Sequence, residues 1–90
     1  MNREDLKSLL RSEGIDDGAY VLEGDEHSGD LSKHPRAYSG IYVLKVVVGG
    51  WAVFGYERGH RLNETMFELE DEACQELLTR LLRDHTTRET

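Results

Sequence analysis

The side chains best suited to chemistry begin with the polar stretch "DEHSGDLSKH". It places Asp25, Glu26, His27, Asp30 and His34 close together in sequence. Carboxylate and imidazole groups are the usual ligands of calcium and zinc. However, this spacing matches neither a zinc motif nor an EF-hand loop, and a glycine-punctuated loop does not hold ligands in a fixed geometry. We interpret these residues as solvated loop side chains and expect neither a metal nor another cofactor.

A second polar cluster lies in "ERGHR". Glu57 and His60 could form a carboxylate–imidazole general-base pair beside Arg58 and Arg61. No serine or threonine nucleophile is placed next to them, and a solvated hairpin tip offers no environment that would activate them. Cys74, the single cysteine, has acidic neighbours that disfavour a thiolate, so a buried structural thiol is expected. The sequence therefore predicts a protein that is not an enzyme.

The glycines of "GGWAVFGYERGHR" could cradle phosphate or could form hairpin turns. A phosphate-binding glycine loop leaves a strand and enters a helix, whose N-terminal N–H groups bind the anion. Here Gly49 and Gly50 lead into the strand-like "WAVFGYE", without a GxGxxG or GxxxxGK motif. We expect Gly49-Gly50 to be the two-residue turn of a β-hairpin, and "RG" at 58–59 to be a second turn.

Periodicity and capping residues predict two helices around a small sheet. Asn2 and Asp5 resemble a capping box, and Gly14 suits the end of the same helix. The predicted elements are a helix at 3–13, strands at 19–23, 41–48, 51–57 and 60–69, and a helix at 70–84. We expect one α+β domain of residues 1–90, an antiparallel β-meander of three to four strands flanked by an N-terminal and a C-terminal helix. A long loop at 24–40 and a frayed tail at 85–90 complete it.

Both faces of the predicted hairpin are apolar. With Gly49-Gly50 as the turn, Val48 opposes Trp51, and one face carries Tyr42, Leu44, Val46, Val53 and Gly55, while the other carries Val43, Val47, Phe54 and Tyr56. Two modest helices can cover only one face, and Gly55 suits a site that a helix backbone approaches closely. The leftover apolar face predicts an interface. The alternative is that the 24–40 loop folds over it, held there by Leu31 and Tyr38.

Charge and composition limit the partners. The chain has 90 residues, with 18 Asp and Glu against 11 Lys and Arg, for a formal net charge of −7. Nucleic acid is a poor ligand for such a chain because phosphate binding needs a basic face. The negative charge favours a basic protein partner, or only keeps the protein soluble. One cysteine, no apolar leader and no long apolar run predict a cytoplasmic protein without a membrane partner.

Three stretches together carry a resemblance to a known family. They are "REDLKSLLRSEGID" followed by "YVLEG", then "GGWAVFGYERG", and finally "FELEDEACQELLTRLL". Over roughly 2–23 and 49–83 the chain resembles small bacterial immunity proteins of polymorphic or contact-dependent toxin systems. The resemblance implies a stoichiometric inhibitor that binds a cognate toxin domain, a basic one if the charge is used, and that needs no cofactor. The alternative is a homodimeric structural or regulatory module with no toxin partner.

The aromatic-E-R-G stretch of that resemblance implies partner contacts at Tyr56, Glu57, Arg58 and His60. Phe54 joins this group because it belongs to the leftover apolar face. Charge alone adds the loop acids, which are Asp25, Glu26 and Asp30. The chain departs from the expected pattern at Leu69, where a Ser, Thr or Asp would cap the last helix.

Overall fold

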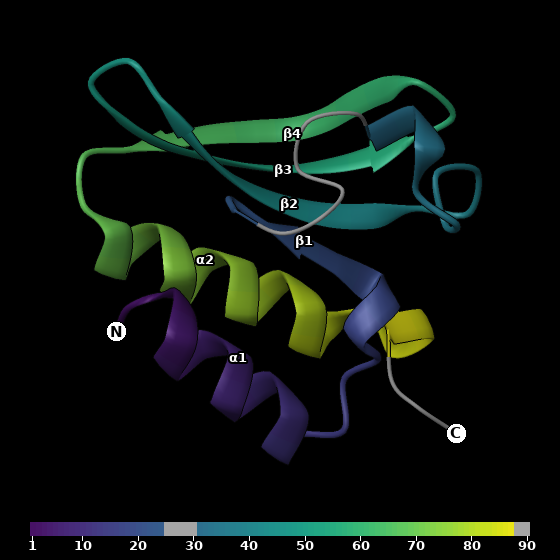
Figure 1. Ribbon diagram of the computed structural model, residues 1–90, viewed down its shortest axis with the longest axis horizontal. Helices are drawn as coiled ribbons and strands as arrows, with labels where there is room; N and C mark the ends of the chain where they lie inside the picture. The colour runs from purple at the N-terminus through teal and green to yellow at the C-terminus, as the bar shows by residue number, and fades with distance from the viewer. Residues whose placement is uncertain (25–30, 88–90) are drawn as a thin grey trace.

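Two helices lie side by side on one face of a four-stranded sheet in the computed structural model of the chain (Figure 1). The structure describes residues 1–24 and 31–87. Its helices and strands are α1 (Arg3–Ser12), β1 (Tyr20–Leu22), β2 (Ile41–Val47), β3 (Gly50–Glu57), β4 (His60–Phe67) and α2 (Glu70–Arg83). Short 3-10 turns at Asp17–Ala19, Leu31–Lys33 and His85–Thr87 connect or follow them.

The sheet has the strand order β1-β2-β3-β4 and is mixed. β2, β3 and β4 form the predicted antiparallel hairpins, but β1 pairs with β2 in parallel, with Tyr20 opposite Tyr42 and Leu22 opposite Leu44. The α+β class and the flanking helices are therefore confirmed, whereas a purely antiparallel meander is wrong. Parallel neighbours need a long crossover connection, and the chain between Leu22 and Ile41 supplies it.

The β2–β3 turn falls one residue earlier than expected. Val47 lies opposite Gly50 and Val46 opposite Trp51, so the turn residues are Val48 and Gly49. Gly50 instead is the first residue of β3, and a glycine is needed there because a Cβ would collide with the carbonyl oxygen of Phe67 on β4. The pairing shifts by two residues, and the side-chain period of a strand is two, so every side chain keeps its predicted face.

The first core lies between the helices and the sheet. α1 contributes Leu6 and Leu10, and α2 contributes Leu77 and Leu81, all fully buried. They pack against the helix-facing side chains of the sheet, which include Leu22, Leu44 and Val53. Burying a leucine or valine side chain stabilises a fold by about 1.5–3 kcal/mol, so this layer supplies much of the folding free energy.

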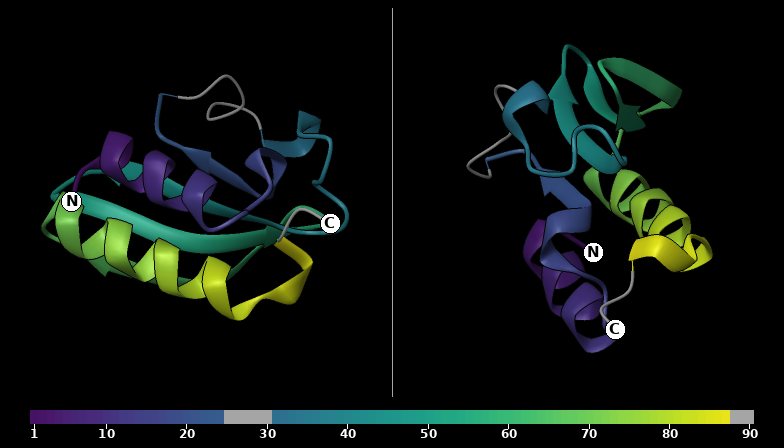
Figure 2. Two further views of the ribbon diagram at one scale, coloured as in Figure 1. Left: turned by 90° about the horizontal axis from the view of Figure 1, so that it is seen from below. Right: turned by 90° about the vertical axis from the view of Figure 1, so that its right-hand side faces the viewer.

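A second core covers the opposite face of the sheet. Phe54 is 0% exposed and packs with Val21, Val43 and Ala52, and Leu31 of the 31–40 segment packs against them. This segment lies across the sheet from the helices (Figures 1 and 2). The loop-cover alternative is therefore confirmed through Leu31, although Tyr38 is 80% exposed and covers nothing. The prediction that Phe54 contacts a partner is wrong, because its ring is sealed inside the protein.

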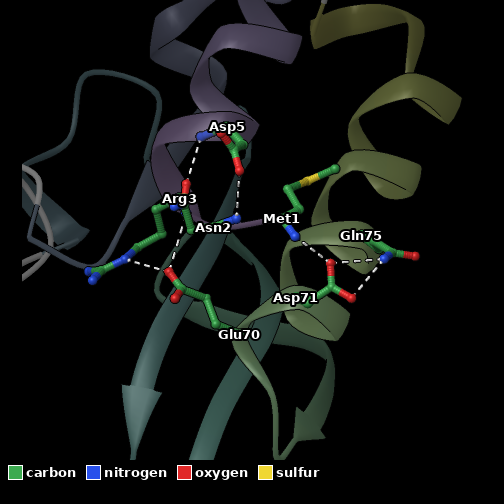
Figure 3. Close-up of polar contacts among 7 residues, drawn as sticks. All are labelled: Met1, Asn2, Arg3, Asp5, Glu70, Asp71 and Gln75. Carbon is green, nitrogen blue, oxygen red and sulfur yellow. Dashed lines mark hydrogen bonds and ion pairs between the residues drawn. The ribbon is translucent and has the colours of Figure 1, made fainter.

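The N-termini of α1 and α2 meet at one end of the molecule, because the helices run in the same direction (Figure 2). Two positive helix ends side by side repel each other, and acidic side chains in both first turns offset this. Arg3 then bonds Glu70 at 3.1 Å, and the Met1 ammonium bonds Asp71 at 2.7 Å (Figure 3). That hydrogen bond from the ammonium is the main reason why the pKa of Asp71 is lowered.

The helix-capping motifs predicted from the sequence have the expected geometry. Asn2 and Asp5 form a complete capping box (Figure 3), and Gly14 and Ile15 close α1 with a Schellman pair of hydrogen bonds to Arg11 and Leu10. Leu69 begins α2 without a side-chain cap.

The chain after α2 is held rather than frayed up to residue 87. Thr87 is buried, and its hydroxyl donates to the Leu81 carbonyl at 2.7 Å. The Asp16 N–H donates to the Thr87 carbonyl at 2.7 Å. The expected frayed tail at 85–90 is therefore wrong for 85–87, because these two hydrogen bonds fix the backbone, and 88–90 lie outside the described residues.

A charge placed at Phe54 should unfold the protein. Removing a buried phenylalanine side chain costs about 3–5 kcal/mol, and an unpaired buried carboxylate adds to this. That sum approaches the whole stability of a small domain, so Phe54→Asp should abolish cooperative thermal unfolding followed by circular dichroism. Met66→Asp is the matched control, since Met66 lies on the same face but is 57% exposed. A folded Phe54→Asp protein would contradict the second core.

Candidate functional site

An open groove of about 710 Å³ lies at the end of the sheet formed by the β3–β4 hairpin. Its floor is a row across three strands, in which Tyr42 pairs with Gly55 and Gly55 pairs with Leu62. Around this floor stand side chains of α2 and of the strand ends, which are Glu57, Glu76, Arg80, Arg83 and Asp84. Apolar floor and charged walls make this groove the candidate site.

A β-bulge in β4 turns the floor residue Leu62 toward the groove. Val53 pairs with Thr65, but Gly55 pairs with Leu62, so two residues of β4 oppose one residue of β3. Asn63, in the bulge, has a φ of 54°. Compared with regular alternation from Thr65, the extra residue reverses the face of the β4 side chains that precede the bulge, so Leu62 lies on the helix face. Arg61 consequently stacks over the Phe54 ring on the other face, at 4.4 Å from its centroid.

Arg80 on α2 holds this bulge in place. Its Nη2 donates to the Asn63 carbonyl at 2.8 Å and to the Thr65 hydroxyl at 3.0 Å. Its Nε pairs with Glu76 at 2.8 Å, one helical turn earlier. The guanidinium is largely buried and joins α2 to the edge strand, so it serves as a structural clamp on the groove wall.

Arg83 and Glu57 differ from Arg80 because their charged groups have no partner within the described part of the chain. Within residues 1–24 and 31–87, neither side chain forms a hydrogen bond or an ion pair. A free cation and a free carboxylate on one groove are available to a partner.

The Tyr42 hydroxyl donates to Asp84 at 2.7 Å on the floor of the groove. Burial, followed by this hydrogen bond to a carboxylate, raises the pKa of Tyr42 to about 12. Burial opposes ionisation of Asp84, but hydrogen bonds from Thr86 and Tyr42 outweigh it and hold the pKa of Asp84 below its ordinary value. The pair is therefore a neutral phenol on an ionised carboxylate throughout the neutral range.

Gly55 leaves a hollow in the floor. The expectation that a helix backbone approaches this glycine is wrong, because the three atoms nearest to a Cβ built there belong to Leu62 and Ile41 of the neighbouring strands. A glycine inside a strand costs about 0.5–1 kcal/mol relative to alanine. The position would accept a larger residue, but the glycine leaves a hollow between Tyr42 and Leu62.

The structure brings part of the predicted partner surface together. Glu57 lines the groove, and Arg58 and His60 lie exposed in the turn and strand that follow. Tyr56 also borders the groove, but its ring packs against the second core on the other face of the sheet. The Arg58 N–H donates to the Ala37 carbonyl at 2.8 Å, which anchors this hairpin to the 31–40 segment. Phe54 is buried in that second core. Asp25, Glu26 and Asp30 lie outside the described residues.

Some of the residues considered for metal or thiol chemistry lie in the described part of the chain, and there they are held in structural contacts. His34 is buried, and its Nδ1 accepts a hydrogen bond from the Arg36 N–H at 3.0 Å. In the described part of the chain, no three His, Cys, Asp or Glu side chains gather as a metal site would require. Cys74 is buried, and burial followed by the nearby Glu70 raises the pKa of its thiol to about 11.

Sequence reasoning missed the groove wall supplied by α2. Glu76, Arg80 and Arg83 are spaced by four and then three residues beside the apolar stripe, so they share one side of the helix, and Asp84 follows as its C-cap. That spacing was a usable signal, but the sequence alone does not reveal that this side looks onto β4.

Comparisons of the chain with protein-family models, with curated proteins and with solved structures found no match. Among the described residues, no helix combines the length and the apolar character that crossing a bilayer requires.

Replacing Arg80 should loosen the edge of the groove. Arg80→Met keeps the aliphatic stem but leaves the Asn63 carbonyl and Glu76 without their charged partner. Hydrogen bonds to charged groups contribute about 1.5–3 kcal/mol, and we expect a loss of that size in chemical denaturation. Amide hydrogen exchange should accelerate in β4. Arg83→Met, one helical turn on, is the control and should change stability by less than about 0.5 kcal/mol. Equal effects of both variants would contradict the clamp.

Tyr42 should make stability depend on alkaline pH. The unfolded chain releases its phenol proton near the ordinary pKa of 10.0, whereas the folded protein holds it to about 12. The contribution of Tyr42 is therefore complete below pH 10 and is lost as the pH rises from 10 to 12. An absorbance titration of phenolate should show a late ionisation step that Tyr42→Phe removes. Tyr38→Phe, at an exposed position, should leave that late step unchanged.

Proposed function

We propose that this chain is a binding module that neutralises a cognate bacterial toxin in the cytoplasm by stoichiometric protein–protein interaction. The single observation that carries the proposal is the braced β3–β4 hairpin beside an open groove. It places Glu57 on the groove and Arg58 and His60 next to it, while the ring of Tyr56, which also borders the groove, packs against the second core. Arginine is among the residue types that most often anchor protein interfaces, and Arg58 is exposed.

The rigidity of this surface supports binding. The hairpin is tied to the 31–40 segment through Arg58, and the opposite wall is tied to β4 through Arg80. A surface that is already ordered loses little conformational entropy when a partner docks, so more of the contact energy remains as affinity.

Charge supports a basic partner. The formal net charge is −7, and the field of an acidic protein accelerates its encounter with a basic one. The proposal assigns no reaction and no cofactor to the chain, and it rests on the resemblance of "GGWAVFGYERG" to immunity proteins together with the groove.

Co-expression with the product of the adjacent gene tests the proposal. We expect that product to be toxic alone, to be harmless with this chain, and to co-purify with it in a one-to-one complex. Glu57→Arg should weaken binding by at least about tenfold, which corresponds to 1.4 kcal/mol. Glu68→Arg makes the same charge change at an exposed position outside the groove and should leave binding intact.

An adjacent gene product that is harmless alone and does not co-purify would contradict toxin neutralisation. The same holds for a homodimer that resists dilution in sedimentation and binds no other protein. That result would favour the homodimeric alternative, for which the exposed side chains of Val46, Val48 and Leu69 at the other end of the sheet offer an apolar surface.

A further inference from the structure

Gly55 occupies its position for a reason other than backbone geometry. Its φ does not lie in the left-handed region that favours glycine. A Cβ built there would meet Leu62 Cβ at 3.7 Å and the carbonyl oxygens of Leu62 and Ile41 at 3.8 and 3.9 Å, which are ordinary contacts. An alanine therefore fits without strain. What the glycine provides is the space above it, between Tyr42 and Leu62.

The shape of this space suits a long, narrow side chain. Tyr42 and Leu62 flank it along the strand-to-strand row, so an aliphatic stem laid over Gly55 would contact apolar groups on both sides. The floor of a sheet carries no free backbone donor or acceptor at a paired position, so the hollow itself favours methylene groups.

The charges around the hollow select the head group. Arg80 is already bound to Glu76, Asn63 and Thr65, so its charge is committed. The Glu57 carboxylate and the Arg83 guanidinium make no ion pair within the described chain, and Asp84 accepts hydrogen bonds only from uncharged groups. Among the side chains that line the groove, the carboxylates of Glu57, Glu76 and Asp84 outnumber the guanidinium groups of Arg80 and Arg83 by one. Arg36, which pairs with Asp16, lies near Asp84, so Glu57 is the carboxylate left for a cationic head group.

Resting on the proposed function, we infer that the hollow above Gly55 receives a lysine or arginine side chain of the basic partner. The aliphatic stem lies between Tyr42 and Leu62, and the cationic head reaches the carboxylate of Glu57 at the rim. Gly55 is thus the residue that determines specificity, since any larger side chain occupies the space of the stem.

A blocked amino acid tests this inference without the partner. N-acetyl-arginine amide, titrated into the full-length protein, should shift the amide resonances of Gly40, Gly55 and Leu62 with a dissociation constant in the millimolar range. N-acetyl-norleucine amide has a stem but no charge and should bind more weakly by about tenfold. Shifts scattered over the whole surface, or equal binding of the two probes, would overturn the assignment.

Variants of the hollow separate filling from unfolding. Gly55→Ala should retain the fold with an unchanged or higher Tm, and Gly55→Leu should reduce binding of the arginine probe by at least about tenfold while circular dichroism stays native. If Gly55→Leu does not fold, Glu57→Gln carries the test and should weaken the probe by about tenfold, with Glu68→Gln as its control. Undiminished binding by the folded variants would overturn the inference.

The two proposals fail in different ways. If the wild-type chain neutralises the adjacent gene product and Gly55→Leu or Glu57→Gln does so equally well, the role of the hollow is wrong and the proposed function stands. If the arginine probe binds as expected but no gene product is neutralised, the hollow stands and the proposed function is wrong.

Discussion

The sheet has two apolar faces, and a chain of 90 residues must shield both from water. α1 and α2 cover one face and leave nothing for the other. The 31–40 segment covers the second face, and it can do so because it belongs to the crossover between parallel strands β1 and β2. Such a connection has to pass over one face of a sheet. The parallel pairing and the second core therefore both follow from the need to shield two apolar faces. The polar composition of the loop gave no indication of this structural role.

Covering one face with two helices that run in the same direction brings their positive ends together. α2 also begins at Leu69 without a side-chain cap. Glu70 and Asp71 offset both the repulsion between the helix ends and the missing cap of α2. They lie in the first turn of α2, and they also bind Arg3 and the Met1 ammonium (Figure 3). Exposed pairs of this kind contribute only about 0–1 kcal/mol each. They join the first turns of the two helices directly, while the leucine core that α1 and α2 share holds the helices against the sheet.

Features that depend on neighbouring residues in sequence were predictable, and features that depend on distant residues were not. The capping box at Asn2 and the Schellman end at Gly14 follow from local chemistry, and the faces of β2 and β3 follow from a period of two. The exact turn was not predictable, because Gly50 is required by the approach of β4 rather than by the hairpin. The bulge at Asn63 is bound by Arg80, which is distant in sequence, so the groove could not be assembled from the sequence although Glu57 was identified.

Two helices do not leave a whole sheet face uncovered, because the 31–40 segment packs on the second face. Apart from exposed side chains such as Val46, Met66 and Leu69 toward the other end, the open part of the sheet is one end of the helix face. α2 reaches its last turn at Arg83 over the row of Tyr42, Gly55 and Leu62, where Gly55 supplies no side chain to meet it. Polar and charged groups of α2 therefore stand above an apolar floor without filling it. Because Arg80 clamps one wall and the Arg58 backbone ties the other, the groove does not collapse to bury that floor. A hollow that the fold holds open, rather than a loosely packed region, is the feature that a partner can use.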